Sequence, residues 1–212
     1  MASLLLDQPA VAKHNSAGKI GPNAVIQTVN ALVELYGSAA TAALLEEIGK
    51  PWLIDYRPGS LIDEREFEAL HQDLIGARGI AATNRVMARA GELTSRYVMA
   101  NRIPRPAQRA LRLLPNAIAL RALLGAISQH TWTFAGSGRF SYTTGRAPML
   151  AIERCLTARG LTSDVPTCAF YEAAFQGFLT TLIDARLRVR EVRCAACGAG
   201  RCEFTIAGEA LR

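Results

Sequence analysis

A glutamate and three cysteines, crowded into one short segment, constrain the fold of this chain more than any other feature. In EVRCAACGAGRCEF, the residues Glu191, Cys194, Cys197 and Cys202 lie within twelve positions. The preceding run RLRVREV alternates arginine with apolar residues and predicts a strand with one wet face. CAACGAGRC is rich in turn-forming residues, and CEFTIA predicts a returning strand. The two strands of such a hairpin would bring all four side chains close together.

A further cysteine lies well upstream, at the start of a predicted helix over residues 168–185. A helix dipole favours a thiolate at that position, so Cys168 could join the hairpin as a fourth ligand. Three thiolates and a carboxylate, or four thiolates, suit a tetrahedral zinc ion, and a closed site of this kind is structural. A redox pair, an iron–sulfur cluster and unligated thiols remain alternatives. The redox pair is disfavoured because Cys197 is followed by Gly-Ala-Gly and a strand, not by a helix.

The hydrophobic pattern changes period near residue 130. Before it, apolar residues recur at helical spacing. The predicted helices cover residues 22–36, 38–48, 63–76, 79–102 and 106–127, and Pro115 is expected to kink or split the last one. After it, HTWTF (130–134) and RFSYTT (139–144) alternate around AGSG and predict a β-hairpin, followed by a strand over 149–156. We therefore expect an α+β fold in which a helical N-terminal half packs on an antiparallel sheet. A flexible tail over 1–20 would precede a single domain over 21–212.

Charge is distributed unevenly along the chain. The net charge is +6, and the segment from Arg78 to Arg146 holds eleven arginines but one acid, Glu92. This excess predicts an acidic partner: a nucleic acid, a membrane surface or a ligand that carries carboxylates. No nucleic-acid-binding motif accompanies it, so we expect no nucleic acid. No apolar run is long enough to cross a membrane, and the N-terminus lacks a basic start, so we expect a cytoplasmic protein.

The cysteine pattern resembles the vinyl-4-reductase domain of bacterial sensor proteins, over about 145–207. The whole chain resembles the bacteriochlorophyll 4-vinyl reductase family, from GKIGPNAVIQ through SGRFSYTTGRAPMLAIERC to the hairpin. The resemblance implies a TRAPP-like fold, a homodimer and a role in bacteriochlorophyll synthesis, with peripheral attachment to the photosynthetic membrane as an option. It also implies zinc bound by Cys168, Glu191, Cys194 and Cys202. Cys197 is an addition to the pattern, which leaves open whether Glu191 or Cys197 completes the site.

The residues give little support to the reductase activity in the family name. A hydride transfer needs a nicotinamide, a flavin or a low-potential cluster, and no dinucleotide-binding motif is present. We therefore expect a carrier that binds a magnesium tetrapyrrole and delivers it between enzymes of the pathway, with magnesium chelatase and a methyltransferase as partners. A vinyl reductase with an external reductant is the alternative. A tetrapyrrole pocket needs apolar walls and a few polar groups, and the aromatic segment near residue 130 offers them. The predicted ligand-binding residues are His130, Trp132, Phe134, Phe140 and Tyr142.

Overall fold

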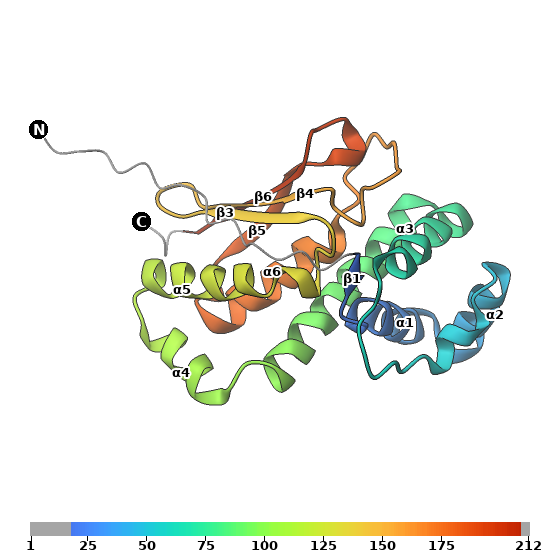
Figure 1. The fold of residues 1–212 in the computed structure, drawn as a ribbon, viewed down its shortest axis with the longest axis horizontal. Helices are drawn as coiled ribbons and strands as arrows, with labels where there is room; N and C mark the ends of the chain where they lie inside the picture. Colours follow the sequence, from blue (N-terminus) through green and yellow to red (C-terminus); the bar gives the residue numbers. More distant parts are fainter. Residues whose placement is uncertain (1–17, 209–212) are drawn as a thin grey trace, which may run out of the picture.

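The chain folds into a helical half followed by a half built on an antiparallel sheet (Figure 1). The structure is a computed structural model that describes residues 18–208. The helices are α1 (Asn23–Tyr36), α2 (Ser38–Glu47), α3 (Glu64–Asn101), α4 (Arg105–Leu113), α5 (Asn116–Gln129) and α6 (Ala169–Leu182), with short 3-10 turns at η1 (Pro51–Asp55), η2 (Thr131–Thr133) and η3 (Ala195–Cys197). The strands are β1 (Lys19–Ile20), β2 (Ile62–Asp63), β3 (Arg139–Thr143), β4 (Met149–Glu153), β5 (Arg188–Arg193) and β6 (Cys202–Ala207). The α+β prediction is confirmed.

The main sheet has the strand order β3-β4-β6-β5, and each neighbouring pair is antiparallel. Phe140 lies opposite Ile152, and Leu150 lies opposite Phe204; all four side chains are fully buried. On β5 the predicted alternation holds, because Val189 and the next inward residue are buried while the arginines between them are exposed. Helix α6 packs against β5, and α3 packs against α6 (Figure 1).

Two glycines allow helices α3 and α6 to cross at very short range. A Cβ atom on Gly91 would lie 2.2 Å from the carbonyl oxygen of Phe170, inside van der Waals contact. A Cβ atom on Gly177 would lie 2.1 Å from the Ser95 hydroxyl. The backbones therefore approach to a distance that no larger residue permits at either position. This crossing fixes where the first turn of α6 lies relative to the sheet.

Breaks in the helical half fall at a glycine and a proline. The helices predicted over 63–76 and 79–102 join in one long segment, α3, that bends at Gly79 (φ 75°, ψ 165°), a conformation that favours glycine. Asp63 caps α3 by accepting a hydrogen bond from the Arg65 backbone N–H at 2.9 Å. Pro115 splits the helix predicted over 106–127 into α4 and α5, as expected.

The hairpin predicted between HTWTF (130–134) and RFSYTT (139–144) is wrong. Residues 131–133 instead form η2, a tight turn that continues α5, and β3 pairs with β4. The Thr131 hydroxyl donates to the carbonyl of Ser128 at 2.8 Å, and the Thr133 hydroxyl donates to that of His130 at 2.7 Å. Such local bonds from threonine compete with strand pairing. The alternation of threonine and aromatic residues was therefore a misleading strand signal.

Candidate metal centre

Three elements bring four potential metal ligands together inside the protein. Cys168 lies at the start of α6, Glu191 on β5, Cys194 just after β5 and Cys202 at the first position of β6. All four are buried, and one ligand atom from each lies within 4.8 Å of the others. The Cys168 Sγ is 3.3 Å from the Cys202 Sγ and 3.9 Å from the Cys194 Sγ. The cluster therefore ties the C-terminal hairpin to the helix that packs on it.

Strand alternation explains why the carboxylate points inward. Glu191 follows Val189 on the same, buried face of β5, and a register irregularity lies between Glu191 and Arg193. The Glu191 Oε2 accepts a hydrogen bond from the Cys168 backbone N–H at 3.1 Å, whereas Oε1 is buried without a hydrogen-bond partner. Burial, followed by the adjacent Cys194 thiol, raises the pKa of Glu191 to about 8. A buried carboxylate of this kind lacks a partner that a cation would supply.

The donor set fits a thiophilic divalent ion. Three sulfur atoms and one carboxylate oxygen provide the number and types of ligand that tetrahedral zinc takes. The Ala195 backbone N–H donates to the Cys202 Sγ at 3.3 Å, a contact that orients a sulfur ligand and stabilises its thiolate form. All four ligands are contributed by buried side chains, so a bound ion would have no open position for water. Such a site stabilises a fold and does not catalyse a reaction.

Cys197 lies on the surface, outside the group of four. Turn η3 carries it away from the hairpin interior, and Gly198 follows in the left-handed conformation (φ 88°, ψ 3°). Its side chain is exposed, whereas the other four cysteines are buried. Its backbone N–H still bonds to the Cys194 carbonyl at 3.0 Å, which holds the turn. The geometry therefore favours Glu191 over Cys197 as the fourth ligand.

Cys155 and His71 border the cluster, and the sequence analysis missed both. The Cys155 Sγ lies 3.5 Å from the Cys168 Sγ and 3.5 Å from the Thr157 hydroxyl. A cysteine at the end of the predicted strand over 149–156 was the available signal for it. His71 on α3 is fully buried, neither ring nitrogen has a hydrogen-bond partner, and burial lowers its pKa to about 4. Only the packing of α3 places this histidine near Cys194, so no local sequence pattern announced it.

The predicted ligand-binding residues divide between core and surface. Phe134 and Phe140 have ring centroids 5.6 Å apart, and both pack on Phe175, at 6.3 and 5.8 Å. Trp132 and Tyr142 are half-buried, at the edge of this aromatic cluster. His130 is exposed, and its Nδ1 lies 2.9 Å from the Ala126 carbonyl oxygen. The structure thus gathers the aromatic residues but leaves the histidine in solvent at the end of α5.

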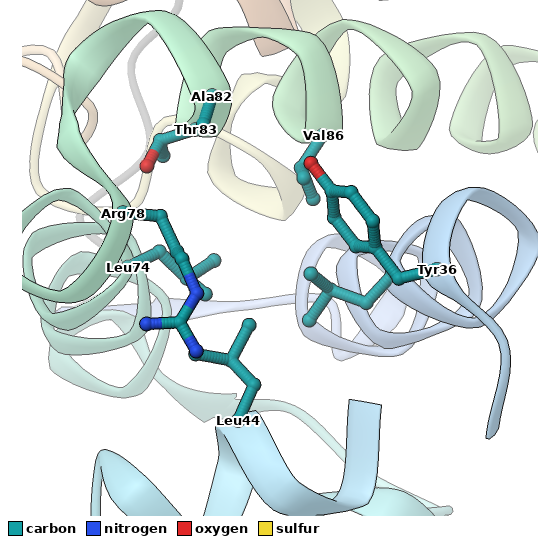
Figure 2. A pocket seen from close by; sticks show the side chains of 8 residues that line it. Tyr36, Leu44, Leu74, Arg78, Ala82, Thr83 and Val86 are labelled. Atoms are coloured by element: carbon teal, nitrogen blue, oxygen red, sulfur yellow. The ribbon is translucent and has the colours of Figure 1, made fainter. Parts of the chain in front are cut away.

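A small pocket lies elsewhere, between α1, α2 and the bend of α3 (Figure 2). Its volume is about 190 Å³, and apolar side chains and Arg78 line it. Arg78 forms an ion pair with Glu47 at 2.6 Å. Pockets for small organic ligands usually enclose about 300–1,000 Å³. This pocket is therefore too small to enclose a tetrapyrrole.

Comparisons with known proteins define the class first. A family model for the vinyl-4-reductase domain matches residues 148–207. The fold is similar to the phenol-responsive sensory domain of the transcription activator PoxR, solved with phenol (TM-score 0.51, 15% identity, 81% of this chain and 91% of that one). It is also similar to an H-NOX protein of T. tengcongensis (TM-score 0.56, 16% identity, 87% and 95%). The chain is thus a vinyl-4-reductase-domain protein with a fold shared by H-NOX and PoxR sensory domains.

Two relatives narrow the assignment. The chain is 37% identical over 193 residues to the bacteriochlorophyll synthase 23 kDa chain of Cereibacter sphaeroides, and the match covers 90% of this chain and 91% of the relative. It is 32% identical over 197 residues to the protein of the same name from Rhodobacter capsulatus, with 93% and 91% covered. The chain belongs to this family, which confirms the resemblance found in the sequence. No helix within residues 18–208 is both long and apolar enough to cross a membrane.

Proposed function

We propose that this protein is an accessory protein of bacteriochlorophyll biosynthesis that binds a magnesium tetrapyrrole and delivers it between pathway enzymes. Its relatives are named as a chain of bacteriochlorophyll synthase, which supports the pathway. Solved proteins of similar fold include one described by its heme redox potential and porphyrin distortion, so a fold of this type can hold a tetrapyrrole. Magnesium chelatase and a methyltransferase are the proposed partners, and the protein is proposed to act as a homodimer.

The observation that carries the carrier hypothesis is the closed character of the metal cluster. All four donors are buried, and a tetrahedral ion held by them would have no position for substrate. A hydride donor would therefore have to come from a nicotinamide or flavin, for which the sequence offers no binding motif. We propose that the cluster holds a structural zinc ion and that Cys168, Glu191, Cys194 and Cys202 are its ligands.

The proposed tetrapyrrole surface lies beside the aromatic cluster. Trp132 and Tyr142 are half-buried, so each ring presents part of its face to solvent and can cover a flat apolar ligand. His130 lies one residue before η2, with an exposed ring whose Nδ1 is turned to the Ala126 carbonyl. If Nδ1 carries the proton, the other ring nitrogen has a free lone pair, as a magnesium ligand requires. Exposed arginines of the same segment, such as Arg139, can meet carboxylates of the ligand.

An absorbance titration with a magnesium divinyl tetrapyrrole tests the proposal. We expect a saturable red shift that NADPH leaves unchanged. Trp132→Ala should weaken binding about tenfold or more, because a ring contributes roughly 1–3 kcal/mol when it stacks on a flat ligand. The matched control is Trp52→Ala, since Trp52 is 50% exposed at a distant 3-10 turn.

The other outcomes separate the alternatives. Conversion to a blue-shifted monovinyl product with NADPH would make the protein a vinyl reductase that uses an external reductant. Absence of any spectral shift would exclude tetrapyrrole binding and leave a protein with a structural role in the pathway. An equal effect of the Trp132 and Trp52 substitutions would place the ligand elsewhere on the protein.

A further inference from the structure

Helix α4 and the start of α5 form a projecting corner of the molecule (Figure 1). None of the residues of α4 is buried, in contrast to the other five α-helices. The corner is nevertheless a defined structure, because the Gln108 side chain donates to the Met99 and Ile103 carbonyls at 2.6 and 2.8 Å. Arg112 donates from Nε to the Thr181 carbonyl at 3.1 Å and so attaches α4 to α6. A helix that buries nothing in its own fold but is held in place is suited to contact something else.

The outer side of α4 carries a basic row and an apolar row. Positions i, i+4 and i+7 lie on one side of a helix. The basic row consists of Arg105, Arg109 and Arg112, and the adjacent apolar row consists of Pro106, Ala110 and Leu113, all exposed. The apolar surface continues across Pro115 to Leu114 and Ile118. Together these residues make up what we call the corner surface.

The charge of the corner surface has no internal counterpart. Residues 93–152 contain eight arginines and no aspartate or glutamate. Arg105 and Arg109 form no ion pair with any described acidic side chain, whereas Arg78 and Arg89 elsewhere on the helical half pair with Glu47 and Glu34. Unpaired arginines beside one another repel, so the corner surface is electrostatically complementary to a polyanion.

The apolar residues decide which polyanion fits. Leu113 is 86% exposed, Ile118 54% and Leu114 39%, all at the tip of the corner. Nucleic acid offers no apolar layer next to its phosphates. Protein interfaces bury aromatic and arginine side chains in shaped pockets, and leucine is rarely their anchor. A bilayer with anionic lipids presents both phosphates and, just beneath them, hydrocarbon, and amphipathic helices that combine basic and leucine-rich faces bind there.

We propose that the corner surface is a docking site for an anionic lipid membrane. Leu113, Leu114 and Ile118 would enter the boundary between headgroups and acyl chains. Arg105 and Arg109 would contact lipid phosphates through charge-assisted hydrogen bonds. The protein would attach to one leaflet without crossing it. This inference does not depend on tetrapyrrole binding.

Flotation with vesicles tests the inference on the full-length protein without any tetrapyrrole. The vesicles contain phosphatidylcholine alone or with about 30% phosphatidylglycerol, at low and high salt. We expect binding to the anionic vesicles that weakens at high salt. Arg105→Gln with Arg109→Gln should lower the partition coefficient about fivefold per arginine, and Leu113→Gln with Ile118→Gln should lower it about tenfold or more. The matched control is Arg190→Gln with Val192→Gln on β5, where Val192 is 49% exposed.

Each result decides the matter. Loss of binding in both corner variants but not in the control supports the docking site, provided that circular dichroism shows unchanged folding. Failure of the wild type to bind anionic vesicles would overturn it. So would equal weakening by the β5 control, which would place the contact elsewhere. Binding to poly-L-glutamate in the absence of vesicle binding would overturn it in favour of an acidic protein partner.

Discussion

At the scale of single residues, Glu191 is the most unusual group in the protein. It is a carboxylate on a buried strand face, with one oxygen bound to a backbone N–H and the other without a partner. A hydrophobic residue would be the ordinary choice for this position. The presence of a carboxylate among three buried thiols is understandable if a cation neutralises them together.

Glu191→Gln therefore provides a direct test of the metal centre. The substitution keeps the shape and removes the charge, so we expect zinc affinity to fall by at least about tenfold. Cys197→Ser is the matched control, since Cys197 is exposed and outside the cluster. Metal analysis after purification without chelator should give about one zinc ion per chain for the wild type and the control. Loss of zinc in Cys197→Ser with retention in Glu191→Gln would reverse the assignment, and an iron–sulfur chromophore would replace zinc.

A second buried carboxylate has an opposite environment. Glu64 accepts hydrogen bonds from the Ser137 N–H and hydroxyl, both at 2.6 Å, and pairs with Arg159 at 2.8 Å. Burial alone would raise the Glu64 pKa, but the bonds from Ser137 and the guanidinium of Arg159 lower it below 4.5. A group with a lowered pKa in the folded state contributes stability above its unfolded pKa, and this contribution is lost as the pH falls.

We expect the wild type to lose stability relative to Glu64→Gln as the pH falls from about 6 to below the ordinary carboxylate range. Urea denaturation at a series of pH values measures this difference. Glu46→Gln is the control, because Glu46 is exposed on α2 and its side chain has no comparable set of bonds within the described residues. Parallel pH profiles for the wild type and Glu64→Gln would show that the Glu64 bonds do not stabilise the native state.

At the scale of elements, the crossing of α3 and α6 determines where Cys168 is held. Gly91→Ala places a methyl group 2.2 Å from the Phe170 carbonyl oxygen, next to the first turn of α6. The backbone must move, and we expect a loss of about 2–3 kcal/mol in the free energy of unfolding. Gly76→Ala is the matched control in the same helix. Nothing lies within 4 Å of its added Cβ atom, so it should stabilise the protein by about 0.5–1 kcal/mol. Thermal denaturation of both variants checks the contrast, and equal effects would contradict the close crossing.

The same elements show what sequence can and cannot predict. The break at Pro115 and the wet face of β5 followed from local rules, because proline geometry and strand alternation do not depend on the rest of the fold. The strand predicted over 130–134 failed because threonine hydroxyls bond to nearby carbonyls, an option that a polarity pattern does not reveal. The four cluster residues were identified by spacing and resemblance, whereas His71 and Cys155 join their surroundings only through tertiary packing. Burial of a residue from a distant helix is a property of the assembled molecule.

At the scale of the whole molecule, the metal cluster is the point at which the sheet half is connected to α6, and through α6 to α3. The hairpin of β5 and β6 supplies three donors, and α6 supplies the fourth. Without a metal ion, four polar groups would share a buried volume with few hydrogen bonds among them. Removal of the ion should therefore loosen the contact between α6 and the hairpin before it affects the N-terminal helices.

Hydrogen exchange with and without chelator measures this directly. After treatment with chelator, we expect faster exchange at the first turn of α6 and along β5 and β6, with little change in α1 and α2. The melting temperature should fall by about 5 °C or more, because a structural ion contributes several kcal/mol to folding. Re-addition of zinc to the treated protein should restore both, and the same treatment of Glu191→Gln should have little further effect. Uniform acceleration over all helices would mean that the cluster supports the entire core, and unchanged exchange would mean that it holds no structural metal.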